Sequence, residues 1–237
     1  MIQDIGALLV SHPGPGFLGG LPLEDVNGRP LVERLLQQLR GWDRVRRSRV
    51  DRHRSLHGAI ALAASIDPSD DPLCDWANSI DLPYVRSSSG ELAERVAEGA
   101  ELAGFTWVAP IDPRDAIVDI RGFELASTFA QVGIDLVTNR DALGIAAWPV
   151  EIVRTSSIDT HSIGSITADG LWGTDLEKCA DVPATDSHVD VRVRSREDLQ
   201  RLRAFAESEV TDWTTMTAST VSRWFGDQEF ASLRAAA

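Results

Sequence analysis

The chain has 237 residues and a formal net charge of −13, with 36 acidic against 23 basic side chains. This acidity argues against a general binder of nucleic acid or of anionic membranes, because the phosphates of either would be repelled. No apolar run reaches the roughly 20 residues needed to span a bilayer, and the first residues lack the basic start of a signal peptide. The two cysteines give no zinc spacing and no disulfide framework. We therefore expect a cytoplasmic protein with neither a nucleic-acid nor a membrane partner.

The first forty residues predict a strand, a glycine-rich loop and a helix. The strand is the apolar run 6–10, and the helix is 32–39, where apolar residues recur at helical spacing. Between them, residues 11–20 contain four glycines and two prolines, which exclude regular structure. Backbone N–H groups can approach an anion closely where no Cβ intervenes. This order of elements is therefore typical of a phosphate-binding loop.

Apolar runs and helical patterns continue to alternate up to about residue 140. Further strands are expected at 59–64, 82–85, 105–110 and 134–137, and helices at 69–80, 89–103 and 122–132. Ser69 or Asp70 would cap the first of these helices, and Leu92, Val96 and Leu102 would face inward from the second. Such alternation indicates βαβ units, a mainly parallel sheet and a single α/β domain over 1–237.

The pattern changes after residue 148. Strands are expected at 150–153 and 188–193, but the polar stretch 156–185 shows no sustained period and is either an active-site insertion or an irregular excursion. Its Trp172 and carboxylates suit a sugar or base pocket, although a plain loop anchored by Trp172 is the more frequent outcome.

A capping box and three aromatic residues mark the C-terminal part. Ser195-Arg-Glu-Asp198 is the capping box, and it opens a helix at 199–207. From residue 211 onward we expect a helical region that docks through Trp213, Trp224 and Phe225.

Several motifs give the chain a resemblance to a known family. Residues 23–31 read Leu-Glu-Asp-Val-Asn-Gly-Arg-Pro-Leu, and residues 65–73 read Ser-Ile-Asp-Pro-Ser-Asp-Asp-Pro-Leu. The stretch 82–88, Leu-Pro-Tyr-Val-Arg-Ser-Ser, and the stretch 92–95, Leu-Ala-Glu-Arg, continue the pattern. On these residues the chain resembles the spore-coat-polysaccharide type of cytidylyltransferase, which is related to the acylneuraminate and Kdo cytidylyltransferases.

The resemblance implies a three-layer α/β/α sandwich with a mostly parallel sheet, of the Rossmann-like, GT-A nucleotide-diphosphosugar-transferase kind. It implies transfer of a nucleotidyl group, in the family a cytidylyl group, from a nucleoside triphosphate to a sugar or sugar acid, with Mg²⁺ as the cofactor. A role in polysaccharide biosynthesis would follow. The partners would be a nucleotide and a sugar or sugar acid, and a homodimer stays open.

The nucleotide site implied by the resemblance begins in the loop after the first strand. Its expected residues are Ser11, His12, Gly14, Gly16, Gly20, Arg86, Ser88 and Arg95. The family pattern A-R-x-G-S-x-R-L-P-G-K keeps both of its glycines here, but His12, Phe17 and Leu21 stand at its three basic positions. Each missing charge-assisted contact is worth roughly 1.5–3 kcal/mol. A catalytically silent homologue that binds a nucleotide, a sugar or a partner is therefore the alternative to an active transferase.

Asp112 and Asp115 are the predicted catalytic and metal-binding residues. They follow the strand at 105–110, at the end where open α/β sheets bind ligands. The family alignment puts Arg114 where an acidic metal ligand is expected and Arg194 at a second acidic position. An arginine can hold a phosphate but cannot bind a metal. Loop aspartates beside proline also serve as simple turn residues, so both readings of this loop stay open.

Overall fold

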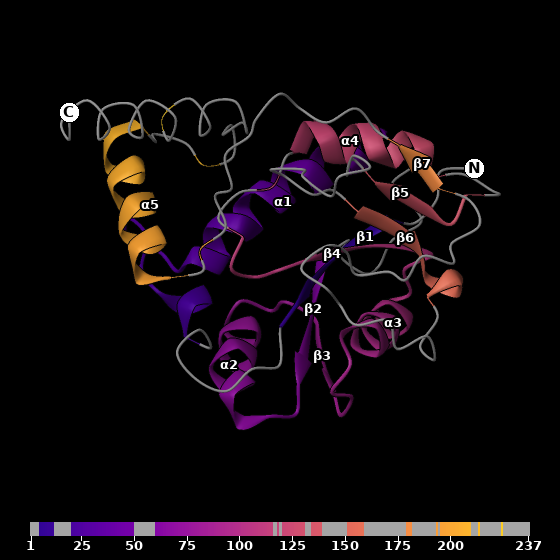
Figure 1. Cartoon of the computed structure of the whole chain (residues 1–237), viewed down its shortest axis with the longest axis horizontal. Helices are drawn as coiled ribbons and strands as arrows, with labels where there is room; N and C mark the ends of the chain where they lie inside the picture. Colours follow the sequence, from indigo (N-terminus) through magenta and orange to yellow (C-terminus); the bar gives the residue numbers. More distant parts are fainter. Residues whose placement is uncertain are drawn as a thin grey trace, which may run out of the picture.

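Figure 1 shows the computed structural model of the chain. The described residues are 5–11, 20–49, 60–115, 118, 120–130, 134–138, 151–158, 179–181, 193, 195–209, 213 and 224. The helices are α1 (Leu31–Arg49), α2 (Asp71–Ser79), α3 (Leu92–Ala103), α4 (Ile120–Phe129) and α5 (Arg196–Glu209). The strands are β1 (Ile5–Val10), β2 (Ile60–Ser65), β3 (Tyr84–Ser87), β4 (Trp107–Ile111), β5 (Leu136–Thr138), β6 (Glu151–Arg154) and β7 (Cys179–Asp181). Short 3₁₀ turns lie at η1 (Leu21–Leu23), η2 (Pro68–Asp70) and η3 (Thr155–Ser157).

The strands form one sheet in the order β3-β2-β1-β4-β6-β5-β7. Within the described part of the chain, β6 is antiparallel to both of its neighbours and the remaining pairs are parallel. From β1 the chain moves to β2 and β3 on one side and then returns to β4 on the other side of β1. The sheet therefore has a topological switch point between β1 and β4.

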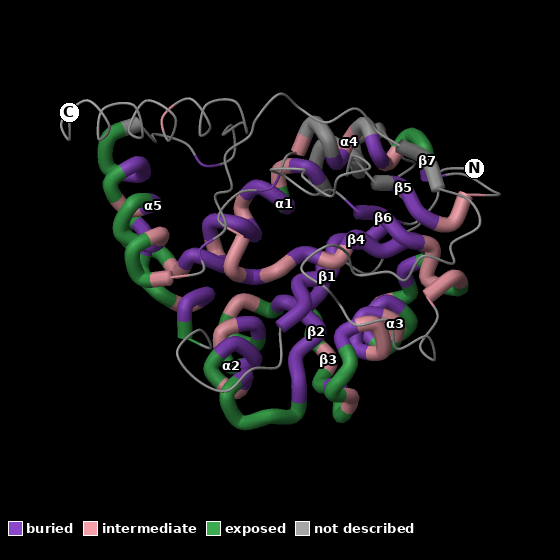
Figure 2. Tube along the Cα trace, viewed as in Figure 1, coloured by how far each residue is buried: buried purple, intermediate pink, exposed green. Residues whose placement is uncertain are grey.

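Helices cover both faces of this sheet, which confirms the predicted three-layer α/β fold. Alternate residues of β1 point to opposite faces. Ala7 and Leu9 join the cluster covered by α1, α2 and α4. Leu8 and Val10 join the cluster covered by α3. Figure 2 shows the central strands buried along their length between these helices.

The motif at 23–31 forms a tight hairpin that leads into α1. Asn27 and Gly28 occupy its two central positions with φ of 54° and 80°, and a bridge joins Asp25 to Pro30. Positive φ at both positions is what a two-residue hairpin turn requires, and Asn-Gly supplies it at low cost. The Asp25 carboxylate accepts a hydrogen bond from the Gly28 N–H at 3.1 Å. The motif residues therefore have a structural role that needs no ligand.

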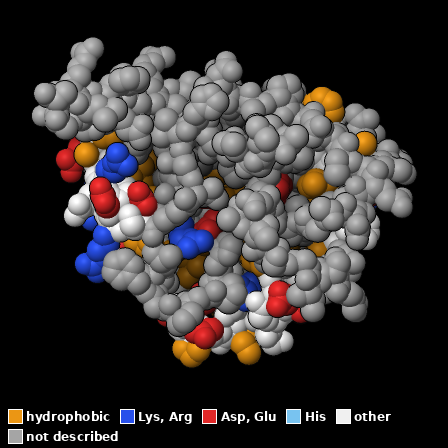
Figure 3. Space-filling model, in the orientation of Figure 1, with side chains coloured by type: hydrophobic (Ala, Val, Ile, Leu, Met, Phe, Trp, Pro, Cys, Tyr) orange, Lys and Arg blue, Asp and Glu red, His pale blue; other side chains and the backbone are white. Residues whose placement is uncertain are grey.

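Helix α5 lies beside this hairpin, apart from the sheet (Figure 1). Arg203 donates from Nε to the carbonyl of Asp25 at 2.6 Å and pairs with Glu24. Ser195 accepts from the Asp198 N–H at 3.1 Å and donates to the Asp198 carboxylate at 2.9 Å, so the predicted serine cap of α5 forms. Figure 3 shows acidic and basic side chains mixed on this part of the surface.

The C-terminal aromatic residues dock as expected where they are described. Trp213 is buried beneath the guanidinium of Arg34, which lies 5.4 Å from its ring. Trp224 lies 5.3 Å from the ring of Phe205 on α5. Phe225 lies outside the described residues, as does the predicted strand at 188–193 except for Val193.

Several element boundaries differ from the sequence prediction. The predicted strand 82–85 is displaced to β3, and α3 begins at Leu92 instead of residue 89. Leu102 was expected to face inward but is 74% exposed, so that prediction is wrong. At about 100° per residue, Leu102 is turned roughly 120° around α3 from the buried Val96, away from the face that packs on the sheet. No helix of the described part is long and apolar enough to cross a membrane.

Candidate functional site

The carboxyl ends of β1 and β4 meet at the switch point of the sheet. Leu9 of β1 pairs with Ile111 of β4, so Ser11 and Asp112 leave the sheet from neighbouring strands. Open α/β sheets bind ligands in the crevice formed at such a point. The glycine-rich loop follows Ser11, although His12, Gly14 and Gly16 lie outside the described residues.

Ser11 is a buried anchor for the start of that loop. Its N–H donates to the carbonyl of Ala63 on β2 at 3.0 Å, and its hydroxyl donates to Asp70 Oδ2 at 2.5 Å. Asp70 Oδ2 also accepts from the N–H of Ser65 at 2.7 Å. The end of β1, the end of β2 and the start of α2 are therefore joined through one carboxylate.

Asp70, one of the two predicted caps, holds the N-cap position of α2, but its side chain makes no capping hydrogen bond there. The side chain of Asp67 instead accepts from the Ser69 N–H at 2.8 Å and caps η2. Hydrogen bonds from Ser69 lower the pKa of Asp67. The sequence shows two adjacent acids at positions 70 and 71. Only the fold shows that Asp70 is buried, whereas Asp71 pairs with Arg86 at the surface.

Arg95 lies beside Ser11 and is fully buried. It donates from Nη1 to the carbonyl of Ser11 and from Nη2 to the carbonyl of Ser89 at 2.9 Å. Its Nε has no hydrogen-bond partner in the described part of the chain. Burial lowers the pKa of Arg95, while Asp70 and Glu98 act in the opposite direction. The structure thus brings Arg95 to the site, where it holds backbone carbonyls.

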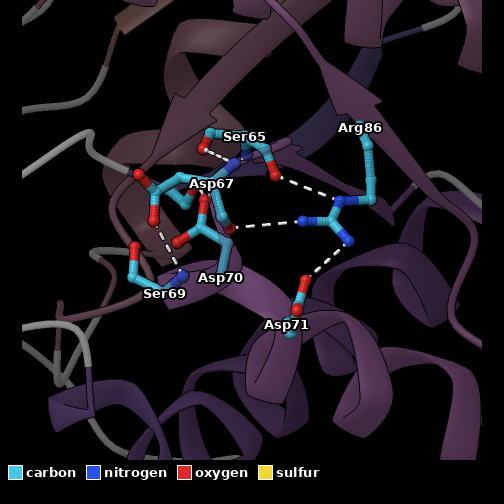
Figure 4. A network of polar contacts seen from close by, with 7 residues as sticks. Ser65, Asp67, Ser69, Asp70, Asp71 and Arg86 are labelled. Carbon is cyan, nitrogen blue, oxygen red and sulfur yellow. Dashed lines mark hydrogen bonds and ion pairs between the residues drawn. The ribbon is translucent and has the colours of Figure 1, made fainter.

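Arg86 lies on the far side of β2 from β1 and stabilises the loop after β2. Figure 4 shows its guanidinium between the β2–α2 loop and Asp71 on α2. It donates to the carbonyls of Ser65 and Asp67 at 3.1 and 3.2 Å, and lies 2.6 Å from Asp71 Oδ1. The hydrogen bond to Asp71 raises the pKa of Arg86. Ser88, two residues further along, is exposed.

The loop re-enters the described part of the chain at Gly20 and Leu21. Gly20 is exposed, and a Cβ placed on it would meet no other atom within 4 Å. Leu21 stands at the basic position of the family pattern and is 3% exposed. Because this side chain is part of the core, the described residues place no cation at that position.

Asp112 is held by Arg114 just after β4. Both Arg114 Nε and the Arg114 backbone N–H lie 2.9 Å from Oδ1, Nε lies 3.0 Å from Oδ2, and Nη2 also donates to Oδ2. The hydrogen bond to Asp112 raises the pKa of Arg114. The N–H of Asp115 donates to the Asp112 carbonyl at 2.9 Å, so the loop is a compact turn.

A magnesium ion, which the family resemblance implies, does not fit Asp112 as Arg114 holds it. Mg²⁺ binds through one or two carboxylates whose oxygens are available to it. Both oxygens of Asp112 already accept hydrogen bonds from Arg114. No group of three or more His, Cys, Asp or Glu residues that could hold a metal occurs in the described part of the chain.

Gln38 is a positioning residue that the sequence did not reveal. It lies buried on α1, and its Oε1 accepts a hydrogen bond from the N–H of Val118 at 3.1 Å. This contact fixes the loop after Asp115 to the helix that follows the glycine-rich segment. A glutamine in a helix has no sequence signal for such a role, because the contact spans 80 residues.

Comparison with solved structures supports this assignment of the fold. A cytidylyltransferase from Leptospira borgpetersenii superposes with a TM-score of 0.73 at 14% identity, with 96% of each chain covered. A 4-diphosphocytidyl-2C-methyl-D-erythritol synthase from Anaerococcus prevotii gives 0.56 at 16% identity, covering 86% of this chain and 99% of the other. CMP:2-keto-3-deoxy-manno-octonic acid synthetase, in complex with CTP, gives 0.52 at 12% identity, with 87% and 99% covered.

Comparisons with family models and with curated proteins give no match. At these low identities the structural likeness concerns the fold. The chain has the fold of the cytidylyltransferases.

Proposed function

We propose that this chain binds a nucleotide at the switch point between β1 and β4, together with a sugar or sugar acid. The observation that carries the proposal is the anchoring of Ser11, which starts the glycine-rich loop beside the Asp112 turn. Glycines in a loop at such a point let backbone N–H groups meet phosphate oxygens. The CTP complex of one structural neighbour supports a nucleotide as the ligand class.

Nucleotidyl transfer is the first candidate activity. In this reaction an oxygen of the sugar or sugar acid attacks the α-phosphorus of a nucleoside triphosphate, and pyrophosphate leaves. The fold supports this candidate, as does the family resemblance of the motifs at 65–73 and 82–95. A cytidylyl group and a product used in polysaccharide biosynthesis are the specific form that the spore-coat resemblance favours.

A catalytically silent binding module is the second candidate. The Asp112–Arg114 pair and the burial of Leu21 favour it, because both remove groups that would stabilise a transferring phosphate. Such a module would bind the nucleotide through the loop backbone and act through a partner, without turnover.

Thermal stabilisation by nucleotides tests the proposed binding. A ligand at 100 times its dissociation constant adds about 2.7 kcal/mol to the free energy of unfolding, which for a chain of this size raises Tm by roughly 5–10 °C. We expect CTP or another nucleoside triphosphate to do so, and Gly14→Val to abolish the shift by placing a side chain in the loop. Gly90→Ala is the matched control, because a Cβ there meets no other atom within 4 Å. The absence of a shift with every nucleotide would overturn the proposal.

Pyrophosphate release separates the two candidates once binding is established. A transferase releases pyrophosphate when CTP is mixed with an accepted sugar or sugar acid. A chain that binds CTP but releases none across a panel of sugar acids is the silent module.

A further inference from the structure

We infer that the Asp112–Arg114 pair replaces the divalent cation at this site, so that the chain holds no metal there and binds its nucleotide without Mg²⁺. The nucleotide half of this inference rests on the proposed function. The metal half stands by itself, because it concerns only the protein's own carboxylates.

The geometry engages both oxygens of Asp112. An ionised carboxylate offers about four lone-pair sites. Three N–H groups of Arg114 point at it: the backbone N–H reaches Oδ1, Nη2 reaches Oδ2, and the single Nε–H is shared between the two oxygens. A metal ion would have to displace a guanidinium that is only two residues away and is held in place by the same turn.

The electrostatics agree with this geometry. A guanidinium and a carboxylate in a bidentate pair cancel each other's charge, and such charge-assisted contacts are strong. The side chains of Arg114 and Asp112 are 24% and 16% exposed, so water screens the pair only partly. The Asp112–Arg114 pair is therefore neutral where a metal ligand would be negative, and Asp115 is the other acid of this turn.

Asp70, the acid beside Ser11, is also engaged. Asp70 Oδ2 accepts from the hydroxyl of Ser11 and from the N–H of Ser65. Mg²⁺ has a strict octahedral geometry and gives up its water reluctantly. Replacing these short, buried contacts with a metal would require both β1 and β2 to move.

Titration with Mn²⁺ alone, followed by electron paramagnetic resonance, tests the metal half. Mn²⁺ is a suitable probe because it takes the same oxygen ligands as Mg²⁺. We expect the Asp112→Asn variant and the natural chain to give the same Mn²⁺ titration. We expect Arg114→Gln, which frees the carboxylate, to bind Mn²⁺ at least about tenfold more tightly, equivalent to about 1.4 kcal/mol. The double variant Asp112→Asn/Arg114→Gln should lose this gain.

Three results would overturn the inference. The first is that the natural chain binds Mn²⁺ and that Asp112→Asn or Asp115→Asn removes this binding. The second is a folded Arg114→Gln chain with no gain in Mn²⁺ affinity. If Arg114→Gln does not fold, Arg114→Lys takes its place, because an ammonium cannot contact both oxygens as a fork does. The third comes from the nucleotide titration.

Calorimetric titration with CTP, in Mg²⁺ or in a chelator, tests the nucleotide half. We expect dissociation constants within about twofold of each other, well below the tenfold change that corresponds to 1.4 kcal/mol. Binding that Mg²⁺ strengthens tenfold or more would overturn the inference. A chain that binds no nucleotide under either condition contradicts the proposed function instead, and the Mn²⁺ result still decides the metal half.

Discussion

The hydroxyl of Ser11 donates to Asp70 Oδ2 across 2.5 Å, and this contact links the end of β1 to the start of α2. Both residues are buried, and the same carboxylate oxygen accepts from the N–H of Ser65. The first residue of the glycine-rich loop is thereby fixed before the loop leaves the sheet. A ligand site at this edge would start from a preorganised backbone.

We expect Ser11→Ala to destabilise the chain by about 1–3 kcal/mol, because Asp70 then loses a buried hydrogen-bond donor. Urea denaturation measures the change. Ser88→Ala, at an exposed serine, is the control and should stay within about 0.5 kcal/mol of the natural chain. Equal stability of the two variants would mean that the Ser11–Asp70 contact contributes nothing to folding.

Arg95→Met should lower the free energy of unfolding more than Arg86→Met does. Arg95 is fully buried and holds the carbonyls of Ser11 and Ser89, so its removal leaves two buried acceptors and we expect a loss of at least about 2 kcal/mol. Arg86 is exposed and its ion pair with Asp71 is screened by water, so we expect a smaller loss than for Arg95. The midpoints of urea unfolding rank the two variants. The reverse order would contradict the structural role assigned to Arg95.

Close packing around two glycines gives a third prediction. A Cβ on Gly6 would lie 2.3 Å from the ring of Phe105, and one on Gly99 would lie 2.9 Å from Ala63 and Leu8. Overpacking of this kind costs about 1–3 kcal/mol, whereas alanine in a helix gains about 1 kcal/mol over glycine. We therefore expect Gly6→Ala to be clearly destabilising and Gly99→Ala less so. Gly90→Ala, where the space is open, should leave Tm unchanged.

The lowered pKa of Asp67 predicts a specific dependence of stability on pH. Hydrogen bonds from Ser69 favour the ionised carboxylate in the folded chain. The folded pKa lies below the unfolded one, so the stabilisation is complete above the ordinary value of 3.8 and is lost as pH falls through the folded value. Asp67→Asn should therefore show a smaller loss of stability than the natural chain as pH falls from 5 to 2. An equal loss of stability in the two chains over this pH range would contradict the lowered pKa of Asp67.

The sequence predicted most of the sandwich because its signals are local. Apolar runs identified β1 and β2, and glycine and proline marked the loop after β1. Ser195 and Asp198 identified the start of α5, since a capping box is complete within four residues. The sequence missed β7, which has three residues and too little length for any periodicity.

At the candidate site, too, the sequence predicted the local features and missed the contacts between distant residues. The sequence selected Ser11, Arg95, Asp112 and Asp115 by motif, and it placed Ser11, Asp112 and Asp115 just after the carboxyl ends of strands. It could not show that Arg95 is buried on the carbonyl of Ser11, a contact that spans 84 residues. It placed Arg114 at an acidic position but did not show that its guanidinium occupies both oxygens of Asp112.

The amino-acid sequence by itself determined most of the strands and helices, because hydrophobic period and turn chemistry act over a few residues. Only the tertiary structure decided the reversed direction of β6, the exposure of Leu102 and the partners of the buried polar groups. Those features depend on which distant segments pack together. Buried donors and acceptors must find partners wherever the fold brings them, and no local pattern encodes that choice.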